Sequence, residues 1–438
     1  MGQREIDPDK RQIVPFAGER LAAIKHRIFS LATLPVCCSL LVGSTSLSEQ
    51  DESLEAVAAR IHDEVLTVDT HVDTPMRLLR PDFDLGERHD PRKSTSKVDL
   101  PRMEEGGLDA VFFAVYVRQG PRTVAGNNAA KERAIRTFHA IHEAIEAHPD
   151  TAKLALTPDD AYRIEKTGKR AIYIGMENGY PIGNDISLIR RYYDLGARYI
   201  TLCHTGNNDI CDSSTDKPEH HGLSAFGKKV VAEMNRLGML IDVSHISDEA
   251  FYDVLEVSKA PVVASHSCAR TLCDHPRNLD DAMLKKLAEK GGVIQVCVLS
   301  SYVKKPAPNP ERNAAMKAFR ERYRRRKELS EKGEREADEQ RRALERKYPR
   351  RFATVSDAVD HIDHIVRIVG IDHVGIGTDF DGGADLDGCY DVSELGNITL
   401  EMVRRGYTES QIRKIWGGNF MRVFRKAIEI AAGAQAIP

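Results

Sequence analysis

Residues 67–73 read TVDTHVD, and this segment decides the fold because a short apolar run ends there on two metal-binding side chains, His71 and Asp73. Three further runs end in the same way: AIYIGME (171–177) at Glu177, MLIDVSH (239–245) at His245 and PVVASH (261–266) at His266. A metal site needs its imidazoles and carboxylates delivered from separate rigid elements to one point. A parallel barrel does this, because all its strands place their C-terminal ends on one face.

Four other apolar runs have the same form but end on polar residues of a different kind. They are LDAVFFAVYV (108–117), followed by Arg118 and Gln119, RYITLCH (198–204), ending at His204, GVIQVCV (292–298), ending before Ser300, and HVGIGTD (373–379), ending at Asp379. Short, nearly continuous apolar runs are typical of strands covered on both sides. Helical patterns lie between the runs, over 127–148, 187–195, 224–237, 248–257, 281–290 and 355–369.

The order of these segments distinguishes two parallel folds. Strand and helix alternating with short turns predict an α/β protein with a (β/α)8 TIM barrel, of the amidohydrolase-like, metal-dependent hydrolase type. A doubly wound open sheet is the alternative, and it would place ligands at one switch point only. Ligands on the first, third, fifth and sixth runs therefore favour a closed barrel over an open sheet.

Length and composition fit one large domain. The chain has 438 residues, ordinary for an α/β barrel with insertions, and 41% hydrophobic residues supply enough apolar surface for a full core. The formal net charge of -3 shows no bias toward polyanions, so nucleic acid is not an expected partner. The absence of a CxxC pair argues against a zinc knuckle, whereas Cys268 and Cys273, or Cys211 with either, are candidates for a disulfide after export.

The N-terminal segment differs from the rest, so we divide the chain into a leader-like part (1–48) and a single barrel (49–438). Basic residues at 25–27 precede an apolar run, IFSLATLPVCCSLLVG (28–43), and small residues follow it. This pattern predicts a secretory signal, and thus an exported, periplasmic or secreted protein without a stable membrane span in its mature form. A membrane anchor and a disordered leader are the alternatives, and without a signal the protein would be cytoplasmic.

One insertion, at 304–351, interrupts the alternation of strands and helices. It opens with prolines and continues with acidic and basic residues interleaved at helical spacing, which predicts solvated helices projecting after the seventh strand. The plainest interpretation is an exposed helical hairpin. A lid or a dimer contact beside the active-site face is the alternative, so a homodimer is left open.

The ligand set predicts two zinc ions per chain. His71 and Asp73 point to the same side of one strand, because residues two apart do so, and form half the shell of one ion. Glu177 is the natural bridge between the two ions, and His245 and His266 complete the coordination shell of the other ion. A water shared by two zinc ions loses its proton near neutral pH and attacks a carbonyl, so hydrolysis by a metal-bridging hydroxide is the expected chemistry.

Hydrolysis also needs an acid for the leaving group and a donor for the oxyanion. Asp379 ends the eighth predicted strand beside the cluster and is the candidate proton shuttle. His204 ends the fourth strand and is the candidate oxyanion donor. Together with Glu177, these two residues are the predicted catalytic groups.

These residues resemble those of the membrane (renal) dipeptidase family of zinc peptidases, which has bacterial members. The likeness runs from about Leu66 to Phe424 and rests on DTHVD, GMENG, LCHTGNND, IDVSH, SHSCAR, HPRNLDD and VGIGTDFDG, in that order. It implies hydrolysis of free dipeptides with broad specificity, including D-residues at the C-terminal position. It also implies that His204 contacts the substrate and that Arg277 pairs with the substrate's C-terminal carboxylate through a bidentate fork.

Two other classes stay open. Another amidohydrolase-type metal hydrolase, acting on amide or lactam bonds, would share the barrel, but such binuclear enzymes often bridge with a carboxylated lysine, and the third strand has none beside Glu177. A non-catalytic metal-binding protein is the third interpretation, and the intact cluster with Asp379 argues against it.

Overall fold

The structure is a computed structural model that describes residues 52–90, 96–324 and 331–435. The signal-like segment 1–48 lies outside the described residues. Eight parallel strands form the path β1-β2-β4-β5-β6-β7-β8-β10. Their bounds are β1 (Val68–Val72), β2 (Ala110–Tyr116), β4 (Arg170–Glu177), β5 (Ala197–Thr201), β6 (Leu240–Asp242), β7 (Val263–Ser267), β8 (Val293–Val296) and β10 (Val374–Ile376). Each of the eight predicted runs therefore contains a strand, and the order along the sheet is the predicted one.

A seam between the first and last strands closes the barrel. Val72 pairs with Phe380 in a parallel bridge, and the amide of Asp73 donates to the Phe380 carbonyl at 2.8 Å. Deeper in the seam, the amide and hydroxyl of Thr378 donate to the carboxylate of Asp69 at 2.9 and 2.6 Å. The predicted (β/α)8 barrel is thus confirmed, and the open-sheet alternative is wrong.

The end of the barrel opposite the predicted site is filled by aromatic rings. Phe112 stacks on Tyr173 and Tyr199, with ring centroids 4.6 and 5.6 Å apart, and Phe420 meets it edge-on at 5.0 Å. All four side chains are buried, and each contributes roughly 1.5–3 kcal/mol by leaving water. Space for Tyr199 exists because a Cβ on Gly175 would overlap its ring. This plug leaves the other end of the barrel for polar groups.

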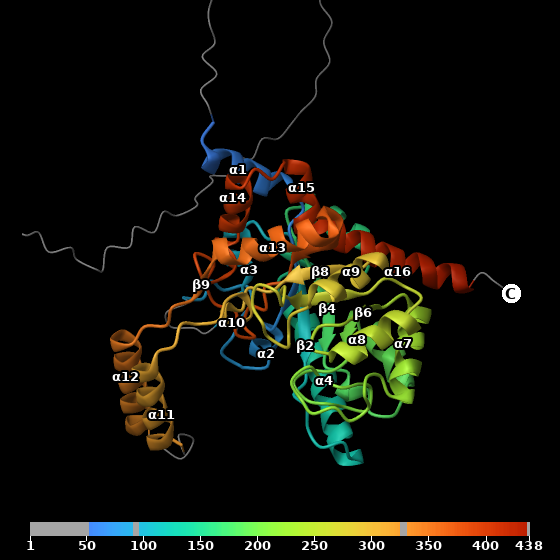
Figure 1. The fold of residues 1–438 in the computed structure, drawn as a ribbon, viewed down its shortest axis with the longest axis horizontal. Helices are drawn as coiled ribbons and strands as arrows, with labels where there is room; N and C mark the ends of the chain where they lie inside the picture. Colours follow the sequence, from blue (N-terminus) through green and yellow to red (C-terminus); the bar gives the residue numbers. More distant parts are fainter. Residues whose placement is uncertain (1–51, 91–95, 325–330, 436–438) are drawn as a thin grey trace, which may run out of the picture.

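Helices cover the outside of the barrel (Figure 1). Several of them begin after a serine, threonine or aspartate that caps the helix. Ser224, Ser247, Asp280 and Thr354 each accept a hydrogen bond from an amide three residues on, as N-caps do. The helices that follow the strands are α4 (Val124–Ala147), α6 (Ser187–Asp194), α7 (Ala225–Leu237), α8 (Asp248–Val257), α9 (Asp281–Glu289), α13 (Val355–Val369) and α16 (Asn419–Gln435). Additional elements are α1 (Leu54–Glu64), α5 (Pro158–Glu165), α14 (Gly396–Arg404) and the short strand β3 (Ala152–Leu154) beside β4.

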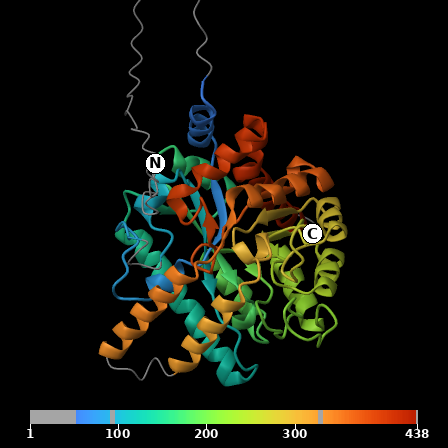
Figure 2. The same cartoon turned by 60° about the vertical axis from the view of Figure 1, so that its left-hand side comes forward.

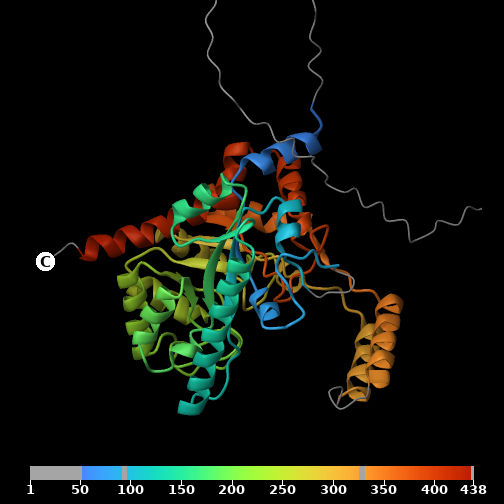
Figure 3. The same cartoon turned by 180° about the vertical axis from the view of Figure 1, so that it is seen from behind.

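The insertion after β8 contains two helices, α11 (Pro310–Arg322) and α12 (Glu331–Lys347). They lie side by side and stand away from the barrel in Figure 1 and Figure 3, and Figure 2 shows them in front of the lower part of the molecule. Arg312 Nε donates to the Tyr348 carbonyl at 3.1 Å, so the two ends of the hairpin are adjacent. Between the hairpin and the barrel, β9 (Ala353–Thr354) pairs with β11 (Leu386–Asp387) (Figure 1).

The six cysteines of the described residues, including Cys211, Cys268 and Cys273, are buried and carry free thiols, so none of the suggested disulfides is formed. Across the described ranges, no helix combines the length and apolar character needed to cross a bilayer.

Candidate metal centre

Seven side chains converge at the C-terminal end of the barrel, and all of them were predicted from strand ends. Their ligand atoms form three overlapping groups. Within each group, the ligand atoms lie within 4.8 Å of one another. The groups are His71, Glu177 and His266; Glu177, His204 and His245; and His71, Asp73 and Asp379. Glu177 and His71 each belong to two groups, so the donors form a row rather than a single shell.

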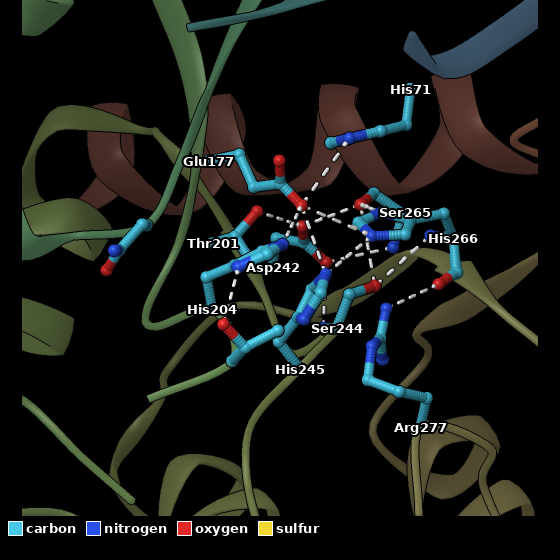
Figure 4. Close-up of polar contacts among 12 residues, drawn as sticks. His71, Glu177, Thr201, His204, Asp242, Ser244, His245, Ser265, His266 and Arg277 are labelled. Carbon is cyan, nitrogen blue, oxygen red and sulfur yellow. Dashed lines mark hydrogen bonds and ion pairs between the residues drawn. The ribbon is translucent and has the colours of Figure 1, made fainter. Parts of the chain in front are cut away.

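Glu177 lies among the four histidines of this row (Figure 4). Its Oε1 is 3.0 Å from His245 Nε2, 3.5 Å from His266 Nε2 and 3.6 Å from the Nε2 atoms of both His71 and His204. The Nε2 atoms of His245 and His266 are 2.9 Å apart. Imidazole nitrogens that converge in this way either share a proton or share a cation.

Several donor atoms at the centre have no hydrogen-bond partner among the described residues. They are His71 Nε2, Asp73 Oδ1, Glu177 Oε2 and His245 Nδ1, all of them buried. Buried polar atoms are normally paired, and an unpaired one costs about 1–3 kcal/mol. A metal ion at this position would satisfy the first three, so the residues present fit the metal that the strand-end pattern implies.

The electrostatics of the centre also favour a cation. Burial raises the pKa of Asp73 and of Glu177, and the Glu177 charge raises that of Asp73 further. Burial likewise raises the pKa of Asp379. It lowers the pKa of His204, and more strongly those of His245 and His266. A buried cluster of three carboxylates and four imidazoles is a strong cation site.

Strained backbone holds several of these side chains in place. Positive φ angles occur at Asn178 (79°), His245 (73°), Asp379 (64°) and Asp381 (68°), each just after a barrel strand. Non-glycine residues in this region cost on the order of 1–3 kcal/mol and cluster at functional sites. β6 ends three residues before His245 and β10 ends three residues before Asp379, so both strands are shorter than the predicted runs.

Asp379 and Asp73 face the same small space, which a glycine keeps open. A Cβ on Gly382 would overlap a carboxylate oxygen of each. Asp381, the neighbouring acid, has a different environment: it accepts from the Thr74 hydroxyl at 2.8 Å and from the Lys97 amide at 2.9 Å. Asp381 therefore holds the loop after β10 against the loop after β1, whereas Asp379 lies within the metal centre.

Arg277 lies beside the centre, buried at 3% exposure. Its guanidinium donates to the His266 carbonyl at 3.1 Å and lies over the Tyr302 ring at 5.4 Å. Within the described residues no carboxylate is within ion-pair distance of Arg277, and its buried Nε has no hydrogen-bond partner. A buried, uncompensated guanidinium is costly unless an anion arrives to pair with it.

The structure adds one residue to those that the sequence predicts for the site. Tyr116 ends β2 in register with Glu177, and its ring meets His204 edge-on at 4.8 Å. Its place at a strand end is the sequence signal that could have identified it, but a tyrosine there is also an ordinary strand residue.

A family model described as membrane dipeptidase (peptidase family M19) matches residues 55–438. The chain belongs to this family. A curated relative, dipeptidase tcpJ of Claviceps purpurea, is 33% identical over 363 residues, which cover 81% of this chain and 75% of that protein.

Solved structures agree with the family assignment. The probable dipeptidase PvdM from Pseudomonas aeruginosa is 29% identical with a TM-score of 0.74, covering 86% of this chain and 99% of its own. A metallo peptidase from Rhodobacter sphaeroides, liganded with a phosphinate mimic of the dipeptide L-Ala-D-Ala, is 25% identical with a TM-score of 0.67, covering 83% and 99%. The resemblance deduced from the motifs is confirmed: this membrane dipeptidase family member is a metal-dependent hydrolase of dipeptides.

Proposed function

We propose that the chain is a binuclear zinc dipeptidase in which Glu177 bridges the two ions. The observation that carries the proposal is the overlap of the ligand groups, because Glu177 belongs to two of them. One ion needs about four donors, whereas this row holds seven side chains. His71 and Asp73 would hold one ion, and His245 and His266 the other.

Zinc fits the chemistry of these donors. Imidazole and carboxylate ligands suit zinc, and the set contains no thiolate. When bound, such ions activate water as a nucleophile and polarise the scissile carbonyl. The protein groups around them would perform the remaining tasks of binding the substrate and moving protons.

Arg277 would anchor the substrate through its C-terminal carboxylate. A planar guanidinium binds a carboxylate with two parallel hydrogen bonds, and here it is buried without an acidic partner in the described chain. The anchored carboxylate would lie one residue from the scissile bond. This arrangement selects free dipeptides over longer or amidated peptides.

His204 and Asp379 would act on either side of the reacting carbonyl. Burial lowers the pKa of His204, so its imidazole is neutral and can donate one N–H to a developing oxyanion. Asp379 has a raised pKa because of burial, which suits a group that accepts and returns a proton near neutral pH. Although His204 also lies within one ligand group, we assign it to the substrate because its imidazole is neutral and because of its position in the site.

A D-residue at the substrate's C-terminal position is a specific part of the proposal. The Rhodobacter sphaeroides neighbour holds a mimic of L-Ala-D-Ala, and the shared fold supports the same class of substrate here. The test is a screen of Gly-D-Ala and L-Ala-D-Ala type dipeptides beside amide and lactam substrates, before and after chelation and zinc restoration. We expect zinc-dependent dipeptide hydrolysis. Hydrolysis of amides or lactams without dipeptides would instead favour the broader amidohydrolase-type alternative.

A further inference from the structure

Two buried hydroxyl groups lie behind two of the candidate ligands. His71 Nδ1 is 2.8 Å from the Tyr199 hydroxyl oxygen, and His266 Nδ1 is 2.8 Å from Ser265 Oγ. Both hydroxyl residues have no solvent exposure. In each histidine the other ring nitrogen, Nε2, faces Glu177. The hydroxyls therefore contact the sides of the rings that point away from the metal centre.

The direction of the Tyr199 hydrogen bond follows from its second partner. The phenolic oxygen lies 3.2 Å from the carbonyl oxygen of Thr70, which can only accept. A hydroxyl has one proton, and it is donated to this carbonyl. The oxygen must then accept from His71, so the His71 proton is on Nδ1 and its Nε2 carries a free lone pair.

The Ser265 hydroxyl is oriented in the same way by a carboxylate. Ser265 Oγ donates to Asp242 Oδ2 at 2.6 Å (Figure 4). Asp242 also accepts from the Thr201 hydroxyl at 2.5 Å and from the amides of Ser244 and Ser265 at 3.0 and 2.9 Å. Four donors around one buried carboxyl require it to be the acceptor throughout. Ser265 consequently accepts from His266 Nδ1, which leaves the His266 Nε2 lone pair free.

His245 provides an internal contrast. Its Nδ1 is buried and has no hydrogen-bond partner among the described residues. Its backbone adopts a φ of 73°, so the position of this ring is set by the turn after β6 rather than by a hydroxyl. The hydroxyl contact is therefore a feature of two particular histidines and not of every ligand at the site.

We propose that Tyr199, and Ser265 together with Asp242, are positioning residues that fix His71 and His266 in the tautomer whose Nε2 binds metal. The proposal rests on the proposed function, because these histidines would belong to different ions of the pair. Partners of this kind typically change metal affinity by 10- to 100-fold. Each hydroxyl would thus control the affinity of one ion position.

The test is stepwise zinc affinity, measured by competition between the apoprotein and a chromophoric chelator. Tyr199→Phe removes one oxygen and keeps the ring, and its matched control is Tyr173→Phe, another buried tyrosine stacked on Phe112. Ser265→Ala has a buried control in Ser258→Ala, whose hydroxyl donates to the Ala260 carbonyl at 2.7 Å. We expect each site variant to weaken one zinc step by about 10- to 100-fold and each control to change neither step more than about twofold.

A further variant covers the case in which Ser265→Ala does not fold. Asp242→Asn keeps the serine hydroxyl but can present an N–H to it, which would turn the serine proton toward His266. This variant is expected to weaken the same zinc step as Ser265→Ala. The visible spectrum of the cobalt-substituted protein gives a second readout, because loss of an imidazole ligand alters it.

The outcomes separate this inference from the proposed function. If the wild-type chain binds two zinc ions and the folded Tyr199→Phe and Asp242→Asn variants bind them equally tightly, the positioning roles are wrong and the binuclear centre stands. If the wild-type chain binds fewer than two ions, both proposals are overturned. Weakening of one step in each variant, with unchanged controls, supports the inference.

Discussion

The backbone amide of Asp379 donates a hydrogen bond of 2.9 Å to the carbonyl of His71. Asp379 follows β10, the last strand of the barrel, and His71 lies near the end of β1, the first strand. The seam that closes the fold therefore also brings a carboxylate to a candidate metal-binding histidine. Deeper in the same seam, Thr378 is bound by Asp69. Barrel closure and assembly of the site are therefore one structural event.

Asp379→Asn should separate proton transfer from metal binding. Asparagine has nearly the same size but cannot accept and return a proton, so kcat should fall by about 10²- to 10⁴-fold while KM changes only a few fold. Metal content should remain as in the wild type. Steady-state kinetics and metal analysis check both points, and loss of a metal ion would show that Asp379 is a ligand.

Asp381→Asn is the matched control for that experiment, because the Asp381 side chain is also buried but pairs with Thr74 and Lys97. Its replacement should lower the midpoint of thermal unfolding and leave kcat close to the wild-type value. If kcat falls steeply in this variant while stability is unchanged, Asp381 rather than Asp379 transfers the proton.

Arg277→Ala should raise KM for free dipeptides and have little effect on substrates whose C-terminal carboxylate is amidated, because amidated substrates never pair with the guanidinium. Kinetics on a matched pair, such as a free dipeptide and its amide, measure the difference. An equal loss on both substrates would mean that Arg277 supports the protein structure through the His266 carbonyl instead.

Much of this site could be predicted because its ligands end strands. The apolar runs determine where the strands lie, and a parallel barrel collects their ends at one face. Tyr199 and Asp242 could not be assigned in this way. Tyr199 lies inside β5, and Asp242 ends β6 but falls inside the predicted run 239–245, where a polar side chain has no sequence signal for its partner. The short strand β3 was missed because three residues carry no readable alternation.

Gly382→Ala should disturb the two carboxylates of the centre without touching the histidines. A Cβ at this position would overlap oxygens of Asp73 and Asp379, and both acids must move to make room. We expect reduced zinc occupancy and activity. Gly433→Ala in α16, where a Cβ would meet nothing within 4 Å, is the control and should keep both properties. Unchanged zinc content in Gly382→Ala would contradict the tight packing around these acids.

Replacing residues 310–348 with a short linker should test whether the insertion serves as a lid. Among the described residues, the ion pairs that join the insertion to the barrel lie at its base, between Lys304 and Asp357, Lys305 and Asp274, and Arg350 and Asp385. The shortened protein should therefore keep its thermal midpoint, its zinc and its KM for dipeptides. A several-fold rise in KM with unchanged stability would make the insertion part of the substrate site.

The most direct test of the account is the number of zinc ions that activity requires. Apoprotein is titrated with zinc while dipeptide hydrolysis and bound metal are measured on the same samples, for the wild type and for Glu177→Gln. A pair of ions bridged by Glu177 predicts that activity reaches its maximum at about two ions per chain. Glu177→Gln should lower occupancy of both positions together, because they share one ligand. Full activity with a single tightly bound ion after exhaustive dialysis would contradict the bridged pair.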